Sequence, residues 1–392
     1  MNPPAVLLGG GLTALAVARS LTRAGVRVFG LGAPGDPLRY SRCRAEFIDV
    51  GHGADFQAGC LDWLERGPRA GVLIPCDDEA LELVAVSRDR LVELSYAPTE
   101  ADDGVVLSML DKQRAYELAR EAGIDTPRSA TVASAAEARA AAAEIGYPCA
   151  LKPRRAHRFR RHLTAGAPGQ GKAFAVHNEA DLDSHLDWTP GREVELIVTE
   201  IIPGPDSDHV SYYGYLDCNG ESLFHVTKRK LRQHPPGFGS GCYHVTEWLP
   251  DVAELGLRLL RELGVRGLAC PEFKRDERDG RLKFIECNHR FTMATEQLRA
   301  SGADLPVFVY RRTLGLPTPR LNSYRTGLGF WYPLRDVRAF ITYRRTGELT
   351  FAEWARSLLR PQRFPAASLR DPVPTLAEAA RKAARIPGLL GR

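Results

Sequence analysis

The feature that most constrains the fold is a short apolar strand that runs into three consecutive glycines. Residues 5–9 are apolar, Gly10 and Gly11 follow, and residues 12–25 have the spacing of an amphipathic helix that ends at a glycine. A second apolar strand is predicted at residues 26–31. Strands that alternate with helices form parallel sheets, so residues 1 to about 105 are predicted to be an α/β unit.

The glycines match the dinucleotide-binding turn Gly9-x-Gly11-x-x-Ala14 only in part. That turn needs an acidic residue about 20 positions later, but the second strand ends in Phe29-Gly30-Leu31-Gly32. We therefore favour another role, in which the glycines let a helix N-terminus approach the sheet. The free N–H groups of Gly10 and Gly11 would then receive an anionic group of a substrate.

A second region mixes strands and helices in an order typical of α+β folds. Its predicted helices are at residues 111–124, 134–146, 178–186 and 252–264, and its predicted strands are at 126–132, 149–153, 172–176 and 195–202. The intervening stretch 154–172 is rich in Arg and Gly. We interpret it as a flexible flap, with a plain disordered loop as the alternative.

The most informative pattern is a predicted hairpin with Glu272 on one strand and Glu286 on the other. If Gly280 takes the left-handed position of the turn, residue 274 pairs with 284 and Glu272 faces Glu286. Alternation then places Lys274 and Asn288 on the face of the carboxylates, with Phe273, Ile285 and Cys287 in the core.

Two carboxylates directly opposite each other repel unless a cation lies between them. Oxygen donors from Glu272, Glu286 and Asn288 favour a hard divalent ion, Mg²⁺ or Mn²⁺, which takes other ligands from phosphates. The alternative is a solvated face on which Lys274 and Arg290 balance the carboxylates.

Further candidates are Lys152, at the end of an apolar strand, and Lys172, at the end of a GxxxxGK sequence. A P-loop would have Ser or Thr next and would open a helix, but Ala173 follows and begins a strand, so we do not predict one. Residues 198–204 are a strand that breaks at Pro-Gly. Its exit can pair with an adenine edge, and Asp206 or Asp208 can bind a ribose.

An extended segment at residues 228–232 places three basic side chains on one side: Lys228, Lys230 and Arg232. Such a row can hold phosphates or a substrate carboxylate. A solvated edge strand guarded by cations explains the same residues nearly as well.

Taken in chain order, these motifs resemble the ATP-grasp superfamily over roughly residues 1–310. The motifs are Lys112, Lys152, the glycine-rich loop, Glu200-Ile201-Ile202-Pro-Gly, Glu272 and Glu286-x-Asn288-x-Arg290. Residues 74–79 and 230–236 are most similar to the carbamoyl-phosphate-synthase-like carboxylate–amine ligases, the group that includes D-aspartate ligase. The resemblance implies a Rossmann-like pre-ATP-grasp domain at 1–108, a two-lobed ATP-grasp domain at 109–310 and a basic helical extension at 311–392.

The resemblance also implies roles for these positions. Lys112, Lys152 and Lys172 would bind ATP phosphates, Glu200, Ile201 and Ile202 the adenine, and Asp208 the ribose. Glu272, Glu286 and Asn288 would bind two Mg²⁺ ions. Arg290 would stabilise the transferring phosphoryl group, and Lys274 is a second catalytic candidate. His289 replaces the proline of the common pattern, on the face away from the ligands.

The implied reaction is ATP-dependent activation of a carboxylate as an acyl phosphate, which an amine then attacks. Both substrates would be small molecules, of amino-acid type. Candidate substrate residues are Gly10, Gly11, Asp78, Lys230 and Arg232. Two alternatives stay open: an ATP-binding scaffold or sensor, and a kinase that stops at the phosphorylated product.

Composition limits the other function classes. The formal charge of +5 is too small to indicate nucleic-acid binding, and no apolar run is long enough for a transmembrane helix. Eight scattered cysteines without a secretory leader favour the cytoplasm. Residues 311–392 hold 16 Lys and Arg against five Asp and Glu. This tail can touch an anionic surface, bind an acidic partner or stay solvated, and a homodimer is a further option that the sequence does not decide.

Overall fold

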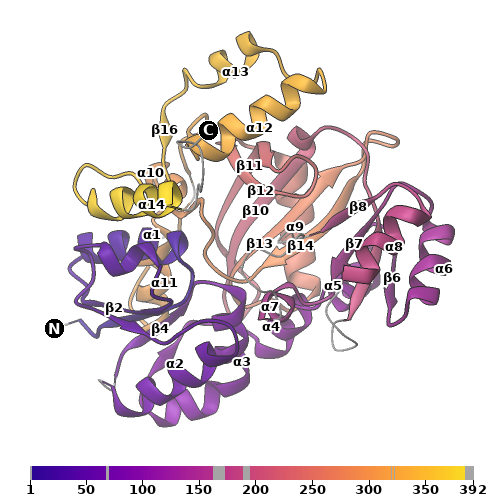
Figure 1. The fold of residues 1–392 in the computed structure, drawn as a ribbon. Coiled ribbons are helices and arrows are strands. Elements are labelled where there is room, and N and C mark those ends of the chain that lie inside the picture. Colours follow the sequence, from indigo (N-terminus) through magenta and orange to yellow (C-terminus); the bar gives the residue numbers. More distant parts are fainter. Residues whose placement is uncertain are drawn as a thin grey trace. The chain divides into compact units, whose positions relative to one another are not determined.

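The computed structural model describes residues 2–67, 70–161, 173–188, 195–318, 320–321 and 323–384 (Figure 1). Its contacts divide the chain into two compact units. Unit 1 is Met1–Glu100, Arg290–Thr318 and Arg363–Arg392, and unit 2 is Ala101–His289 and Pro319–Gln362. This differs from the three consecutive segments expected above, because residues 311–392 contribute to both units. In the part of the chain that the structure describes, no helix is long and apolar enough to cross a membrane.

Unit 1 contains a five-stranded parallel sheet, which confirms the predicted α/β class. The strands are β1 (Ala5–Leu8), β2 (Val28–Gly32), β3 (Glu46–Asp49), β4 (Val72–Pro75) and β5 (Ala97–Pro98), in the order β3-β2-β1-β4-β5. The helices of this unit are α1 (Leu12–Arg23), α2 (Ala54–Arg66), α3 (Asp78–Glu93), α10 (Thr295–Ala300), α11 (Leu305–Thr313) and α14 (Val373–Ala384). Such sheets bind ligands beyond the carboxyl ends of their strands.

A buried ion pair joins distant segments of unit 1. Arg19 of α1 is 3% exposed, and its Nε lies 2.9 Å from Oδ2 of Asp371. Its two terminal nitrogens donate to the backbone oxygens of Ala366 and Asp371, each at 2.8 Å. The segment around residue 371 is therefore bound to α1 through a desolvated, fully hydrogen-bonded charge.

Unit 2 contains two antiparallel sheets. The smaller has the order β6-β9-β7-β8, with β6 (Ser129–Val132), β7 (Cys149–Pro153), β8 (Phe174–Val176) and β9 (Leu196–Glu200). The larger has the order β14-β13-β10-β11-β12-β15-β16, with β10 (His209–Leu216), β11 (Ser222–His234), β12 (Ser240–Thr246), β13 (Gly267–Arg275), β14 (Leu282–Asn288), β15 (Gly329–Trp331) and β16 (Gln362–Arg363). The predicted α+β class is thus confirmed.

Unit 2 also contains eight α-helices among its described residues. They are α4 (Asp103–Met109), α5 (Lys112–Glu121), α6 (Ala135–Ile145), α7 (Ala156–Arg161), α8 (Glu179–Trp188), α9 (Pro250–Glu262), α12 (Pro333–Arg345) and α13 (Phe351–Ser357), and a short 3-10 turn lies at Asp206–Asp208. Helix α9 buries Val252, Leu259 and Leu260, whose spacing is that of one helix face. Gly256 lets this helix approach the sheet, since a Cβ there would lie 2.6 Å from the Tyr212 ring.

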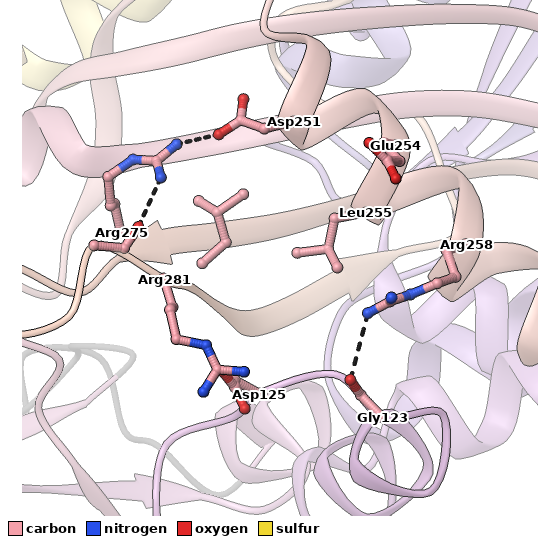
Figure 2. A pocket seen from close by; sticks show the side chains of 10 residues that line it. Gly123, Asp125, Asp251, Glu254, Leu255, Arg258, Arg275 and Arg281 are labelled. Carbon is pink, nitrogen blue, oxygen red and sulfur yellow. Dashed lines mark hydrogen bonds and ion pairs between the residues drawn. The ribbon is translucent and has the colours of Figure 1, made fainter.

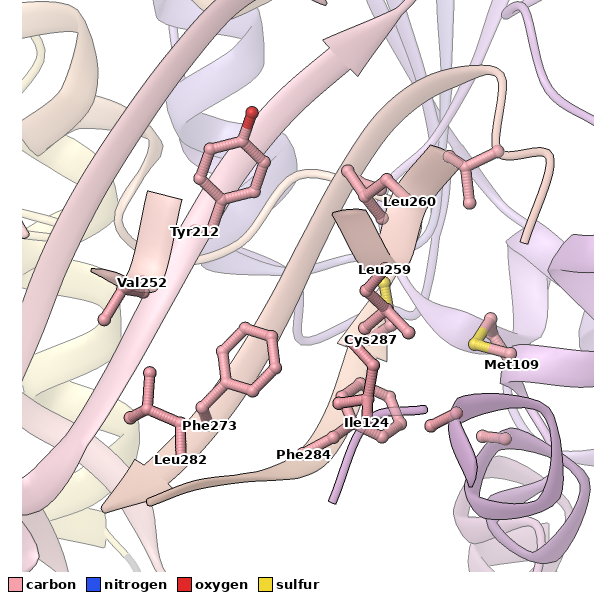
Figure 3. Packing of buried hydrophobic residues seen from close by; sticks show 14 of the residues in the cluster. Met109, Ile124, Tyr212, Val252, Leu259, Leu260, Phe273, Leu282, Phe284 and Cys287 are labelled. Atoms are coloured by element: carbon pink, nitrogen blue, oxygen red, sulfur yellow. The ribbon is translucent and has the colours of Figure 1, made fainter. Parts of the chain in front are cut away.

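One face of the larger sheet is covered by apolar side chains from α9, α4 and α5 (Figure 3). This core includes Tyr212 from β10, Phe273 from β13, and Phe284 and Cys287 from β14. Because successive strand residues point to opposite faces, the neighbours of these residues project from the other face of the sheet. That second face carries the polar side chains described next.

Candidate functional site

The hairpin of β13 and β14 brings the two predicted carboxylates together. Glu272 and Glu286 are direct partners in the ladder, as predicted. The Nδ2 atom of Asn288 lies 3.4 Å from Oε1 of Glu272 and 3.5 Å from Oε1 of Glu286. Two carboxylates and an amide therefore converge on one region of the sheet face.

The pairing nearer the turn differs from the prediction. The register shifts between Glu272 and Phe273, so Lys274 pairs with residue 283 and not with residue 284. Ile285 was expected in the core, but Phe284 takes that place, packed edge-on against Phe273 with ring centroids 6.0 Å apart. A bulge lets Phe284 and Cys287 share one face although their numbers differ in parity.

Lys274 is connected to the segment after β9. Its Nζ donates to the backbone oxygens of Ile202 at 2.8 Å and Gly204 at 2.7 Å. Burial lowers the pKa of Lys274, while the nearby Asp206 and Asp208 act in the opposite direction. The predicted catalytic lysine thus lies on the proposed adenine segment.

Lys230 is the basic residue that reaches the carboxylates. Its Nζ lies 3.4 Å from Oε2 of Glu272. Its ladder partner is His209 on β10, which also pairs with Lys274 on β13. Burial lowers the pKa of His209 far below its usual value, and the two lysines lower it further, so the imidazole is neutral at pH 7.

Of the expected row of Lys228, Lys230 and Arg232, the first two lie on the face of Glu272, whereas Arg232 does not. The Lys228 Nζ lies 2.9 Å from Nδ1 of His244 in the interior. Register shifts flank Arg232, whose guanidinium binds Asp336 through two bonds of 2.6 and 3.1 Å. Arg232 is therefore placed with α12 and not with the carboxylate pair.

Lys112 and Lys152 come together where α5 begins and β7 ends. The N–H of Lys112 donates to the backbone oxygen of Arg154 at 3.1 Å. Burial and the neighbouring Lys112 lower the pKa of Lys152 and Glu286 partly offsets them, with a net value of about 8. Lys152 is thus within electrostatic reach of both Lys112 and Glu286.

Asp111 holds this junction. Its Oδ1 accepts from the N–H groups of Gln113 and Arg114 at the start of α5, and from Nε of Arg154 at 2.7 Å. Burial alone would raise its pKa, but the hydrogen bond from Arg154 and the helix N–H groups lower it overall. An ionised Asp111 therefore both caps α5 and binds the residue that follows β7.

The beginning of the predicted flexible flap has regular structure. Arg154 and Arg155 bind Asp111, and residues 156–161 form α7. Lys172 and the glycines of the flap lie outside the described residues.

The segment after β9 carries the proposed adenine residues. Glu200 ends the strand, and its carboxylate lies 2.7 Å from Arg278 and accepts the N–H of Arg128 at 3.1 Å. Ile201 and Ile202 follow, and Ile202 is buried. The backbone of this exit is held on one side by Lys274.

Asp206 and Asp208 have different surroundings. Asp206 is buried and accepts from Gln233 Nε2 at 2.7 Å, Gly237 N at 2.9 Å and Tyr343 OH at 2.5 Å. Asp208 is half-buried in the same 3-10 turn. Both oxygens of Asp206 are thus occupied by groups of the protein.

The glycine turn of unit 1 is bound by an acid of the same unit. Gly9, Gly10 and Gly11 all have positive φ, and the N–H of Gly10 donates to Oδ2 of Asp77 at 2.8 Å. Asp77 also caps α3 through the Ala80 N–H. One N–H group that was expected to meet a substrate anion therefore already has a carboxyl group as its partner.

Asp78 and Arg290 also meet within unit 1. Nε of Arg290 lies 2.5 Å from Oδ1 of Asp78, at the start of α3. The neighbouring His289 is buried, and burial lowers its pKa to about 4. His289 is therefore neutral at pH 7 and adds no charge beside Asn288.

His209 and Ser211 also lie on this face, although no sequence motif marks them. Ser211 pairs with Glu272 on one side and Lys228 on the other, so it lies in the same cross-strand row. Period-2 spacing of His209, Ser211 and Tyr213 was the available signal. The strand is buried along its whole length, which hides that alternation.

Figure 2 shows a different pocket of unit 2, of about 310 Å³, between α9 and the turn of the β13–β14 hairpin. Its acidic and basic side chains are largely paired with each other, as in Asp125 with Arg281 at 3.0 Å. Asp251 and Arg275 form another pair. None of the predicted site residues lines it, and we assign it no role.

No family model matches the chain. The chain is 24% identical over 336 residues to the formate-dependent phosphoribosylglycinamide formyltransferase of Ignicoccus hospitalis, covering 80% of this chain and 76% of that protein. It is 27% identical over 319 residues to the D-alanine–D-alanine ligase of Ectopseudomonas mendocina, covering 75% and 85%. The biotin carboxylase domain of 2-oxoglutarate carboxylase from Hydrogenobacter thermophilus, solved with MgADP and bicarbonate, shares the fold, with a TM-score of 0.64, 19% identity and coverage of 84% and 73%.

Proposed function

Since this chain belongs to the ATP-grasp superfamily of carboxylate–amine ligases, we propose that it activates a small carboxylate with ATP and joins it to an amine. The observation that carries the proposal is the pairing of Glu272 with Glu286 beside Asn288. Carboxylates in direct opposition weaken a sheet, so their presence favours a cation-binding role.

The donor set fits Mg²⁺ or Mn²⁺. Glu272 and Glu286 supply hard carboxylate oxygens, and the amide of Asn288 can turn its oxygen to the same region. The described residues contain no group of three or more His, Cys, Asp and Glu side chains suited to a metal. A site with two carboxylates and one amide needs further ligands, and we propose that the phosphates of ATP provide them. We propose two metal ions at this site.

The nucleotide is proposed to lie along the polar face of unit 2. Lys112 and Lys152 bind the phosphates, and the exit of β9 at residues 200–202 binds the adenine. Asp208 is our choice for the ribose, because both oxygens of Asp206 already accept hydrogen bonds from protein groups. Lys274 acts by positioning the carbonyls of Ile202 and Gly204.

The proposed reaction has two steps. A substrate carboxylate oxygen attacks the γ-phosphorus, the bond to the bridging oxygen breaks, and ADP leaves. The amine then attacks the acyl carbon, phosphate leaves with its electron pair, and the nitrogen loses a proton. When bound, Mg²⁺ neutralises negative charge on the terminal phosphates.

Residues of the chain supply the rest of the charge. Lys112 and Lys152 neutralise phosphate oxygens, and Lys230 is near enough to Glu272 to balance that carboxylate. Arg290 is proposed to stabilise the transferring phosphoryl group, with Asp78 orienting its guanidinium. The substrate is proposed to be of amino-acid type, as in the D-aspartate ligase group, with Gly11 and Asp78 among its contacts.

The test is release of ADP and phosphate by purified protein with pairs of carboxylates and amines, with mass spectrometry of the products. We expect turnover only when both substrates and Mg²⁺ are present. Glu286→Gln should abolish turnover, whereas the matched control Glu277→Gln, exposed in the turn of the same hairpin, should retain it. Release of AMP, or unchanged turnover in Glu286→Gln, would contradict the proposal.

A further inference from the structure

Helix α12 of unit 2 carries an apolar stripe that the protein leaves exposed. Leu334, Val337 and Ile341 are 44%, 40% and 44% exposed. Their spacing of three and four residues places them along one line of the helix. The opposite side of α12 buries Asp336, Ala339, Phe340 and Tyr343. The stripe is therefore a second apolar surface, distinct from the one that packs on the sheet.

Helix α13 extends this surface. Trp354 stacks on Phe340 of α12 with ring centroids 4.8 Å apart, and Phe351 packs beside it at 5.9 Å. Phe351 nevertheless remains 56% exposed, and Leu359, just after the helix, is 84% exposed. Clusters of exposed large apolar side chains on one element mark interaction surfaces, in contrast to scattered single ones.

Arginines border the stripe. Arg338 and Arg345 lie on one side of it and Arg344 on the other, and all three are exposed. Arg356 and Arg360 add charge along α13 and its exit. The exposed acids of the hairpin are Glu348 and Glu353, two carboxylates against the five exposed arginines. The surface is thus apolar along its centre and basic along its edges.

The hairpin is held in place from beneath. Asp336 is fully buried and accepts from Nε and one terminal nitrogen of Arg232, from Trp331 Nε1 at 3.0 Å and from Trp354 Nε1 at 2.9 Å. A hub of this kind fixes α12 and α13 against β11 and β15. The outward face is therefore preformed and needs no folding step to bind.

We propose that the outward face of α12 and α13 binds the surface of an anionic phospholipid bilayer. The apolar stripe would enter the boundary between headgroups and acyl chains, and the arginines would bind lipid phosphates. The helix would lie on the membrane and not cross it, in agreement with the absence of a spanning helix among the described residues. This proposal does not depend on the proposed reaction.

Charge complementarity selects this occupant over a second copy of the chain. In a symmetric pair each patch meets its own copy, so Arg338, Arg344 and Arg345 would face identical arginines. A bilayer rich in phosphatidylglycerol offers phosphates that pair with each guanidinium and an apolar layer for the stripe. A single anionic bilayer can therefore bind both the apolar stripe and the arginines at its edges.

The test is co-sedimentation of the full chain with vesicles of phosphatidylcholine, alone or mixed with phosphatidylglycerol. We expect binding to the mixed vesicles and not to pure phosphatidylcholine. The double variant Leu334→Gln/Ile341→Gln should weaken binding by about tenfold or more, and Arg338→Gln/Arg345→Gln should also weaken it by about tenfold and reduce its salt dependence. Thermal unfolding of each variant checks that it folds.

The matched control is Val86→Gln on α3, an apolar residue that is 61% exposed in unit 1. It should bind vesicles as the wild type does. Failure of the wild type to bind anionic vesicles at low salt would overturn the proposal. So would an equal loss in Val86→Gln, or light scattering that shows a dimer which Leu334→Gln/Ile341→Gln converts to monomer.

Discussion

Replacing Lys152 with Met should stabilise the protein and weaken the nucleotide binding proposed above. Burial, helped by Lys112, lowers the pKa of Lys152 from 10.5 to about 8. Each pKa unit corresponds to about 1.4 kcal/mol, so the folded state holds this ammonium at a cost of about 3 kcal/mol near pH 7. Methionine has a similar length and no charge, so Lys152→Met should recover most of that free energy.

The pH dependence of the free energy of unfolding shows whether the buried charge of Lys152 is the cause of the difference in stability. Between about pH 8 and 10.5 the unfolded chain binds a proton at Lys152 that the folded state does not, so the stability of the wild type rises with pH in this window. The variant lacks this group. Its advantage over the wild type should therefore fall by about 2 kcal/mol between pH 7 and about pH 9.5.

The assay is urea unfolding followed by circular dichroism, without nucleotide, for the wild type, Lys152→Met and Lys112→Met. Lys112→Met should raise the pKa of Lys152 and keep a weaker pH dependence, because the desolvated ammonium remains. A stability difference between the wild type and Lys152→Met that is independent of pH would refute the reasoning. A second measurement is proton uptake on ATP binding above pH 8, by calorimetry in two buffers, which Lys152→Met should abolish.

Further substitutions test three structural supports, at Asp111, Asp336 and Gly9. Asp111→Asn keeps the cap of α5 but loses the ion pair with Arg154, whereas Asp111→Ala loses both. Urea unfolding should therefore show that the Ala variant is less stable than the Asn variant by about 1 kcal/mol. Equal stabilities of the two variants would argue against the cap. Asp336→Asn leaves Arg232 buried without a carboxylate and should lower the free energy of unfolding by about 3 kcal/mol. The tryptophan emission should also shift, because Trp331 and Trp354 both donate to Asp336. Unchanged emission would contradict the role of Asp336 in holding α12 and α13. Gly9→Ala combines a positive φ with a Cβ position 2.2 Å from Asp77, whereas Gly53→Ala has the same φ of 64° and nothing within 4 Å. Thermal unfolding should therefore show a loss of about 1 kcal/mol for Gly53→Ala and a clearly larger loss for Gly9→Ala.

Local patterns predicted the parts of this protein that depend on neighbours in sequence. The strand–glycine–helix pattern predicted the parallel sheet of unit 1. Period-2 spacing predicted that Glu272 faces Glu286, although the pairing nearer the turn is offset by one residue. Both rest on rules that act over a few residues. The metal and nucleotide roles of these residues stay predictions.

The incorrect predictions concern residues whose positions depend on contacts with residues distant in the sequence. The bulge that moves Ile285 out of the core follows from Phe284, which packs against Phe273 and against Tyr116 of α5. Arg232 leaves the basic row because its partner, Asp336, comes 104 residues later. Neither partner can be identified from the spacing of the strand itself.

The division of residues 311–392 between the two units has the same origin. Net charge and helical periodicity described this segment as one basic extension. The structure shows instead that α12 and α13 belong to unit 2, while α14 belongs to unit 1. Only tertiary contacts such as that of Asp371 with Arg19 distinguish these destinations.

That ion pair has a consequence for biosynthesis. The carboxylate that Arg19 needs in the interior, that of Asp371, is translated more than 300 residues after Arg19 itself. A nascent chain released or cleaved before that point would leave a guanidinium without its counter-ion beneath the first helix. Unit 1 is therefore expected to mature only after Asp371 has been translated, behind unit 2, whose two sheets end at residue 363.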